Sequence, residues 1–177
     1  RDLYAEICGI VPGPVSLECL ATEADAIVAE AKQLASIAEN VVVKVPLIRE
    51  GLIAVKQLAA LGIKTNVTAV CSPLQALLAA KCGATYVSPF VGRWDWMGQV
   101  GMDMIRQIKT IYDNYEFRTE IIVASVRHPL HVLESAMAGA HIATIPMDVV
   151  QQLYHQPMSD VIMAQFNNDW AKVPGKQ

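Results

Sequence analysis

The sequence has no surplus of positive charge and no apolar run long enough to span a bilayer. Its 177 residues include 14 Lys and Arg against 17 Asp and Glu, a formal net charge of −3. It therefore lacks the excess of Lys and Arg that is typical of a nucleic-acid-binding protein. It also lacks both glycine-rich phosphate loops, GxGxxG and GxxxxGK(S/T), which disfavours a nucleotide-binding sheet. We expect neither a membrane span nor a nucleic-acid partner.

Cysteine and histidine are too few and too scattered to indicate a metal site. The four cysteines lie in apolar segments and form no CxxC pair, which predicts reduced thiols, a cytoplasmic protein and no zinc. The four histidines show no metal-binding spacing such as HExxH, and we expect them on the surface or at helix caps. The chain begins at Arg1, with neither a methionine nor a signal peptide.

Short β-branched runs alternate along the chain with longer segments rich in alanine and leucine. Apolar residues at helical spacing predict helices over 22–38 and 50–62. Three of the predicted helix ends carry a glycine, the residue that suits a C-terminal cap. Such alternation predicts parallel strands covered by helices, in an open doubly wound sheet or a (β/α)8 barrel. The predicted strands cover 13–19, 41–47, 63–70, 84–91, 119–126 and 140–147, whereas a closed barrel of this type needs eight strands.

Lys44 stands in a run of valines that is typical of a strand buried on both faces. Lysine is rarely buried without a partner, and burial favours its neutral form. Neighbouring strands also carry polar residues in their C-terminal halves, where barrels and parallel sheets place their sites. These residues are Glu18, Asn66, Thr68, Ser88 and Ser125, and Arg93 and Arg127 follow the ends of two strands. The joint pattern predicts a functional site at this end of the sheet.

A desolvated lysine suggests covalent amine catalysis. Its neutral amine can attack a ketone and form a Schiff base. Glu18 is the only carboxylate predicted in the core of a strand, and it could shuttle protons during that reaction. Arg93 and Arg127 could bind a phosphate, because guanidinium groups match its geometry. The alternative is that Lys44 and Glu18 form only a buried structural ion pair, an arrangement that is costly to desolvate.

Six stretches resemble the small transaldolase family, which includes the fructose-6-phosphate aldolases. The stretches are GPVSLE, NVVVKVPL, GIKTNVTAV, ATYVSPFVGR, ASVR and FNNDWAKV, and they follow the family's order and spacing over nearly the whole chain. The resemblance implies an α/β fold, the (β/α)8 TIM barrel of the Schiff-base aldolase type, formed by residues 1–177 as a single domain. It also implies sugar-phosphate substrates, and no metal or cofactor.

The resemblance implies roles for the polar residues near Lys44. Lys44 matches the family's Schiff-base lysine, and Glu18 matches the acid/base glutamate of transaldolases. Thr68 matches the threonine that positions a catalytic water beside that glutamate. Asn66 and Ser88 match residues that contact the bound dihydroxyacetone unit.

At the other end of the expected site, the resemblance separates two activities. Arg93, Ser125 and Arg127 match the phosphate-binding group. Phe90 stands where the aldolase branch carries a tyrosine whose hydroxyl assists protonation of the enamine, and phenylalanine cannot donate a proton. We therefore expect a transaldolase of the pentose phosphate pathway, which passes a dihydroxyacetone unit from a ketose phosphate to an aldose phosphate. The alternatives are a fructose-6-phosphate aldolase that releases free dihydroxyacetone, or a catalytically dead fragment of either enzyme.

Both ends of the chain carry further expectations from the resemblance. Family members begin with a strand bearing a catalytic aspartate and then a strand of the type TTNPS, and neither is found here. The six predicted strands would then be strands three to eight of an N-terminally truncated barrel. Residues 160–173 are typical of an amphipathic helix, in which Phe166 and Trp170 are four apart. In small family members this helix reaches a neighbouring subunit, so we expect a homo-oligomer, a pentamer or a decamer.

The segment 92–108 is rich in tryptophan and methionine. We expect it to connect a strand to a helix, with Trp94 and Trp96 packed against neighbouring residues. Arg93 is the one residue of this segment to which we assign a functional role.

Overall fold

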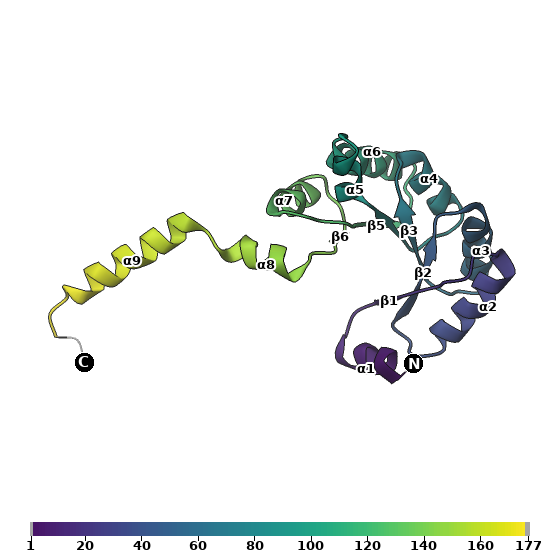
Figure 1. The fold of residues 1–177 in the computed structure, drawn as a ribbon, viewed down its shortest axis with the longest axis horizontal. Coiled ribbons are helices and arrows are strands. Elements are labelled where there is room, and N and C mark those ends of the chain that lie inside the picture. The colour runs from purple at the N-terminus through teal and green to yellow at the C-terminus, as the bar shows by residue number, and fades with distance from the viewer. Residues whose placement is uncertain (1, 176–177) are drawn as a thin grey trace.

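The computed structural model, which describes residues 2–175, contains the predicted alternation of strands and helices (Figure 1). All six strands pair in parallel and in sequence order within one sheet, which confirms that prediction. The strands are β1 Val15–Glu18, β2 Val41–Pro46, β3 Thr65–Val70, β4 Tyr86–Pro89, β5 Glu120–Val123 and β6 Ile142–Ala143. The helices are α1 Asp2–Ile10, α2 Ala24–Ala35, α3 Arg49–Ala60, α4 Pro73–Lys81, α5 Val91–Trp96, α6 Gly101–Asn114, α7 Pro129–Met137, α8 Met147–Tyr154 and α9 Pro157–Ala171.

The sheet curls, and helices α2, α3, α4, α6 and α7 lie along its outer side (Figure 1). This arrangement is a partial (β/α)8 barrel, as the sequence predicted. Within the described residues, β1 and β6 form the two edges of the sheet. The prediction that glycine ends the helices is also confirmed, because Gly62, Gly83 and Gly139 all have positive φ angles of 74°, 88° and 73°.

The hydrophobic core lies between the outer face of the sheet and these helices. Alternate residues of the strands point outward, and this set is fully buried, as in Val43, Val67, Val87 and Ile121. The helices contribute fully buried partners such as Ile27, Leu58, Ile105 and Ile108. Each such side chain stabilises the fold by about 1.5–3 kcal/mol relative to leaving it exposed to water.

The inner face of the sheet has a different character, because it carries polar or partly exposed residues beside buried apolar ones such as Val42. The prediction that the strand at 41–47 is buried on both faces is therefore wrong for Lys44 and Pro46, which are partly exposed. Lys44 lies on β2, the strand next to the edge strand β1, and its side chain faces a cleft rather than a packed layer. The shared register places Glu18, Lys44 and Asn66 side by side across three strands.

The last two helices extend away from the sheet (Figure 1). Helix α9, which contains most of the predicted helix at 160–173, has no buried residue. Its exposed apolar side chains include Met158, Ile162 and Phe166. No helix in the described part of the chain combines the length and the apolar character needed to cross a membrane.

Candidate active site

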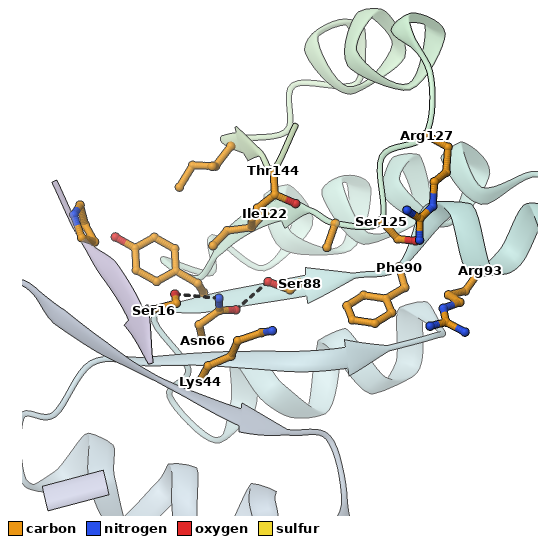
Figure 2. A pocket seen from close by; sticks show the side chains of 14 residues that line it. Ser16, Lys44, Asn66, Ser88, Phe90, Arg93, Ile122, Ser125, Arg127 and Thr144 are labelled. Carbon is orange, nitrogen blue, oxygen red and sulfur yellow. Dashed lines mark hydrogen bonds between the residues drawn. The ribbon is translucent and has the colours of Figure 1, made fainter. Parts of the chain in front are cut away.

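A cleft of about 680 Å³ opens on the inner face of the sheet (Figure 2). Its volume is within the range that suits a small-molecule ligand. Seven of the nine residues predicted for the site line this cleft: Lys44, Asn66, Ser88, Phe90, Arg93, Ser125 and Arg127. The other two, Glu18 and Thr68, lie beside it on β1 and β3. The structure thus brings together residues from four strands, β1 to β4, and from the segments that follow β4 and β5.

Lys44, which lines the cleft, forms an ion pair with Glu18 on β1. The two residues are register partners on adjacent parallel strands, and Lys44 Nζ lies 2.9 Å from Glu18 Oε2. The Lys44 side chain is 27% exposed and the Glu18 side chain is 48% exposed, so the pair is not buried. This contradicts the expectation of a desolvated lysine and also the alternative of a buried structural pair. An exposed pair of this kind contributes little to stability, typically about 0–1 kcal/mol.

A chain of hydrogen bonds fixes the polar floor of the cleft (Figure 2). The Ser88 hydroxyl donates to Asn66 Oδ1 at 2.7 Å, and Asn66 Nδ2 donates to the Ser16 hydroxyl at 3.1 Å. Asn66 and Ser88 are both buried. These two hydrogen bonds hold the Asn66 side chain between β1 and β4. Ser16 was not predicted, although it lies two residues before Glu18 and so shares its strand face.

Thr68 carries a buried hydroxyl that has no hydrogen-bond partner among the described residues. The register of β3 against β4 shifts between Val67 and Val70, and Ala69 within that irregularity has a φ of 58°. Such bulges re-aim side chains and are frequent next to functional sites. A buried hydroxyl without a partner costs free energy, typically about 1–3 kcal/mol, unless water or a ligand satisfies it. The Thr68 hydroxyl is therefore available as a hydrogen-bonding group for a ligand or water that reaches it.

Two arginines line the cleft beyond Phe90 as seen from Lys44 (Figure 2). The guanidinium groups of Arg93 and Arg127 lie 5.1 Å and 5.5 Å from the centroid of the Trp96 ring. Neither forms an ion pair with a carboxylate within the described residues. Two adjacent guanidinium groups without a carboxylate partner suit a phosphate. The expectation that Trp96 packs into its surroundings is wrong, because its ring is exposed and contacts these cations.

A close backbone approach holds the two arginine-bearing segments together. The Gly92 N–H donates to the Ser125 carbonyl oxygen at 3.1 Å. A Cβ added to Gly92 would lie 2.4 Å from that oxygen and 2.8 Å from Arg127 Cγ, so only glycine fits. Ser125 itself has a φ of 62°, and its buried hydroxyl has no partner within the described residues. Strain of this kind concentrates at ligand-binding segments.

The histidines depart from the expectation of surface or capping positions. His128 does cap α7, since its side chain accepts the N–H of His131. His131, however, is only 3% exposed, and its ring lies against Asp95. Asp95, His128 and His131 place ligand atoms within 4.8 Å of one another, but hydrogen bonds occupy both ring nitrogens of His131. The geometry is that of a hydrogen-bonded pair rather than of a metal centre.

Tyr86 is another residue of the cleft that the sequence did not single out. Burial raises the pKa of its hydroxyl, and the neighbouring carboxylate of Glu120 raises it further. The hydroxyl is therefore a neutral hydrogen-bonding group at physiological pH. Alternation along β4 could have identified it, because Tyr86, Ser88 and Phe90 share one face.

The arrangement combines an amine, a carboxylate and an anion-binding group along one cleft. Figure 2 shows the Lys44 side chain directed along the cleft toward Phe90, with Arg93 and Arg127 beyond it. An amine in this position can attack a carbonyl, and a carboxylate in contact with it can move protons. The arginines can hold the charged end of the same ligand.

Comparisons with known proteins agree with this geometry. Residues 2–173 match the family described as Transaldolase/Fructose-6-phosphate aldolase. A probable transaldolase of Maridesulfovibrio salexigens is 58% identical over 173 residues, which cover 98% of this chain and 81% of that protein. A probable transaldolase of Aquifex aeolicus is 56% identical over 176 residues, with 99% and 81% covered. A third, of Desulfotalea psychrophila, is 59% identical over 172 residues, with 97% and 80% covered. The chain therefore belongs to the transaldolase/fructose-6-phosphate aldolase family, as an enzyme of the transferase class.

Proposed function

We propose that this protein is a transaldolase that moves a dihydroxyacetone unit from a ketose phosphate to an aldose phosphate, a reaction of the pentose phosphate pathway. The observation that carries the proposal is the placement of Lys44, in contact with Glu18, in a cleft that Arg93 and Arg127 also line. A sugar phosphate has a carbonyl near one end and a phosphate at the other. The cleft presents the complementary groups in the same order.

In the proposed reaction, the Lys44 amine attacks the ketone carbon and forms a carbinolamine. Glu18, in contact with Lys44 Nζ at 2.9 Å, takes the ammonium proton and later returns a proton to the departing hydroxyl, so that water leaves and a Schiff base forms. A water held by the free hydroxyl of Thr68 would relay these protons. The Glu18 carboxylate, now free of its proton, takes the proton of the substrate hydroxyl on the leaving carbon, so the carbon–carbon bond breaks, an aldose phosphate leaves as an aldehyde and an enamine stays on Lys44. In the transfer that follows, Glu18 returns this proton to the carbonyl oxygen of the acceptor.

Asn66 and Ser88 are proposed to hold the hydroxyl groups of the bound three-carbon unit. Their mutual hydrogen bond holds both side chains in place before the substrate enters. The enamine carbon then attacks the carbonyl of a second aldose phosphate, and hydrolysis of the resulting Schiff base frees the product and Lys44. Atoms balance over the cycle, because the water lost on forming the first Schiff base is regained in hydrolysing the last.

Phe90 supports group transfer over release of free dihydroxyacetone. Its ring lines the cleft between Lys44 and the arginines, and it offers no proton to the enamine (Figure 2). An enamine that is not protonated survives until an aldehyde arrives. A fructose-6-phosphate aldolase remains the second candidate, because the matched family includes both activities.

The experiment that tests this function measures products from fructose 6-phosphate with and without erythrose 4-phosphate as acceptor. We expect a seven-carbon ketose phosphate and glyceraldehyde 3-phosphate with the acceptor, and almost no dihydroxyacetone without it. The matched comparison is Phe90→Tyr, which we expect to release more free dihydroxyacetone. Release of dihydroxyacetone by the wild type without acceptor would favour the aldolase. No conversion of either kind would overturn the proposed function.

We further propose that α9 contacts a second copy of this chain. The helix has no buried residue, and Met158, Ile162 and Phe166 recur every fourth position on it with exposed side chains. An exposed apolar stripe of this kind is typical of a protein interface. Light scattering after size exclusion should give a mass of several chains, and Ile162→Ser with Phe166→Ser should lower it. A monomeric wild type would contradict this.

A cytoplasmic location is part of the same proposal. It is supported by four free cysteines, two of which, Cys8 and Cys19, are buried. Burial raises the pKa of the Cys19 thiol to about 12, aided by Glu30 and Glu18, so this thiol stays protonated and inert. Recovery of the protein in the cytosolic fraction of cells would support the location, and recovery with exported proteins would overturn it.

A further inference from the structure

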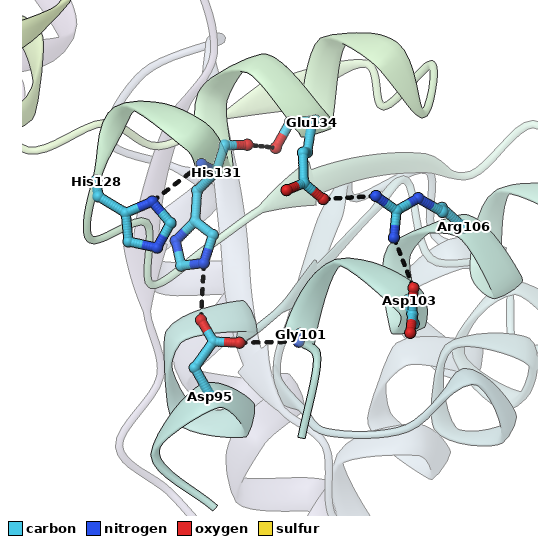
Figure 3. Close-up of polar contacts among 8 residues, drawn as sticks. Asp95, Gly101, Asp103, Arg106, His128, His131 and Glu134 are labelled. Atoms are coloured by element: carbon cyan, nitrogen blue, oxygen red, sulfur yellow. Dashed lines mark hydrogen bonds and ion pairs between the residues drawn. The ribbon is translucent and has the colours of Figure 1, made fainter. Parts of the chain in front are cut away.

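Asp95 and His131 join the two segments that carry the arginines of the cleft (Figure 3). Asp95 lies two residues after Arg93 on α5, and His131 lies four residues after Arg127 on α7. Asp95 Oδ2 is 2.7 Å from His131 Nε2, while Asp95 Oδ1 accepts the Gly101 N–H at 2.9 Å. Neither side chain lines the cleft. The contact thus links the two arginine-bearing segments without itself facing the cleft.

The second nitrogen of His131 contacts the backbone of Arg127. The Arg127 N–H donates to His131 Nδ1 at 3.2 Å. A backbone N–H can only donate, so Nδ1 must be the unprotonated nitrogen of the ring. The ring hydrogen is then on Nε2, where it is donated to Asp95. The partners of the ring therefore define one neutral tautomer.

We infer that Asp95 and His131 are positioning residues for the anion site, in which Asp95 holds His131 in the one tautomer that accepts the Arg127 N–H. This inference rests on the proposed function, because it explains how the phosphate end of that cleft is held. The link fixes Arg127 by its backbone and ties it to α5, the helix that carries Arg93. Recognition of a sugar phosphate then depends on two side chains that the substrate does not touch.

The groups around His131 favour its neutral form. Burial lowers the pKa of His131, and the ring of His128, 3.8 Å away between centroids, lowers it further. The carboxylates of Asp95 and of Glu134 on α7 act in the opposite direction, and Glu134 is itself paired with Arg106 of α6 (Figure 3). A protonated ring would turn an N–H toward the Arg127 N–H and lose that hydrogen bond. A neutral ring keeps its hydrogen bonds to both Asp95 and the Arg127 N–H.

Asp95→Asn tests the tautomer directly. The Gly101 N–H needs the amide oxygen, so the amide NH₂ would face His131 Nε2. His131 would then accept at Nε2 and carry its hydrogen on Nδ1, against the Arg127 N–H. We expect the inhibition constant of inorganic phosphate and the KM of fructose 6-phosphate to rise about tenfold, the loss typical of one charge-assisted contact. The KM of unphosphorylated fructose should not change.

Two substitutions of His131 separate positioning from a merely structural role. His131→Asn keeps an acceptor at the place of Nδ1 and should retain phosphate inhibition within about threefold, below the loss of a full hydrogen bond. His131→Gln keeps a donor toward Asp95 but no acceptor for Arg127, and it should lose inhibition as Asp95→Asn does. His128→Asn is the matched control, because asparagine also caps a helix and leaves the Asp95–His131 contact in place.

The following results would overturn the inference. A wild type that discriminates by phosphate, with Asp95→Asn and His131→Gln folded and unchanged, overturns the inference and leaves the proposed function standing. Equal losses in His131→Asn and His131→Gln, or equal losses on fructose and fructose 6-phosphate, also overturn it in favour of a structural role. A wild type that does not distinguish the two sugars overturns the proposed function and the inference together.

Discussion

Removal of the Arg127 guanidinium should change which sugars the enzyme accepts far more than it changes the stability of the fold. Arg127 is exposed and its guanidinium contacts the Trp96 ring, a contact worth about 0.5–1 kcal/mol at an exposed site. A charge-assisted hydrogen bond to a phosphate is worth about 1.5–3 kcal/mol. Arg127→Ala should therefore lower kcat/KM for fructose 6-phosphate by about ten- to a hundredfold.

The assay measures transfer to an aldehyde acceptor from fructose 6-phosphate and from fructose, for each variant. We expect the value for fructose to stay within about twofold of the wild type, because that sugar makes no phosphate contact. Arg49→Ala is the matched control, since the Arg49 side chain is 85% exposed, pairs with Glu50 and does not line the cleft. Equal losses on both sugars in Arg127→Ala would refute the assignment and indicate a structural role.

Three further predictions follow from the geometry. Thr68→Val removes a buried hydroxyl that has no partner among the described residues, so the free energy of unfolding should stay level or rise by about 1 kcal/mol. The rate of transfer should fall at least about tenfold, and a variant as active as the wild type would contradict the role of Thr68. Gly92→Ala places a Cβ 2.4 Å from the Ser125 carbonyl oxygen, so the free energy of unfolding in a denaturant titration should fall by about 1–3 kcal/mol. Inhibition by phosphate should also weaken, and an unchanged stability and inhibition constant would contradict the close approach. His131 has a lowered pKa in the folded chain, so the unfolded chain binds the proton more readily as the pH falls below 6.5. Its stabilising effect is present above 6.5 and lost as the pH falls through the lowered pKa, and urea titrations should show this loss in the wild type but not in His131→Asn.

Much of the fold could be predicted because local signals and the global arrangement agree. The β-branched runs mark the strands, and glycines such as Gly62 and Gly83 mark the joints between helix and strand. Side-chain alternation then placed Asn66 with Thr68 and Ser88 with Phe90 on shared faces. The parallel register brings Lys44 beside both Glu18 and Asn66, so residues far apart in the sequence meet at one end of the sheet.

The features that the sequence did not predict depend on contacts between distant segments. Asp95 and His131 are 36 positions apart, and no spacing rule connects a carboxylate on one short helix to a histidine on another. The exposure of Lys44 depends on its place one strand from the sheet edge, whereas the valines around it suggest complete burial. The positive φ of Ser125 likewise accompanies its contact with Gly92 of the distant helix α5, and serine has no intrinsic preference for that conformation.

The most direct test of the central claim is reduction of the enzyme with borohydride in the presence of fructose 6-phosphate, followed by mass mapping of the peptides. Borohydride converts a Schiff base into a stable secondary amine, so the modified lysine carries the reacting nitrogen. We predict one adduct, on Lys44, and none in Lys44→Met. An adduct on Lys64 or Lys81 in place of Lys44, or an active enzyme that yields no adduct, would contradict it.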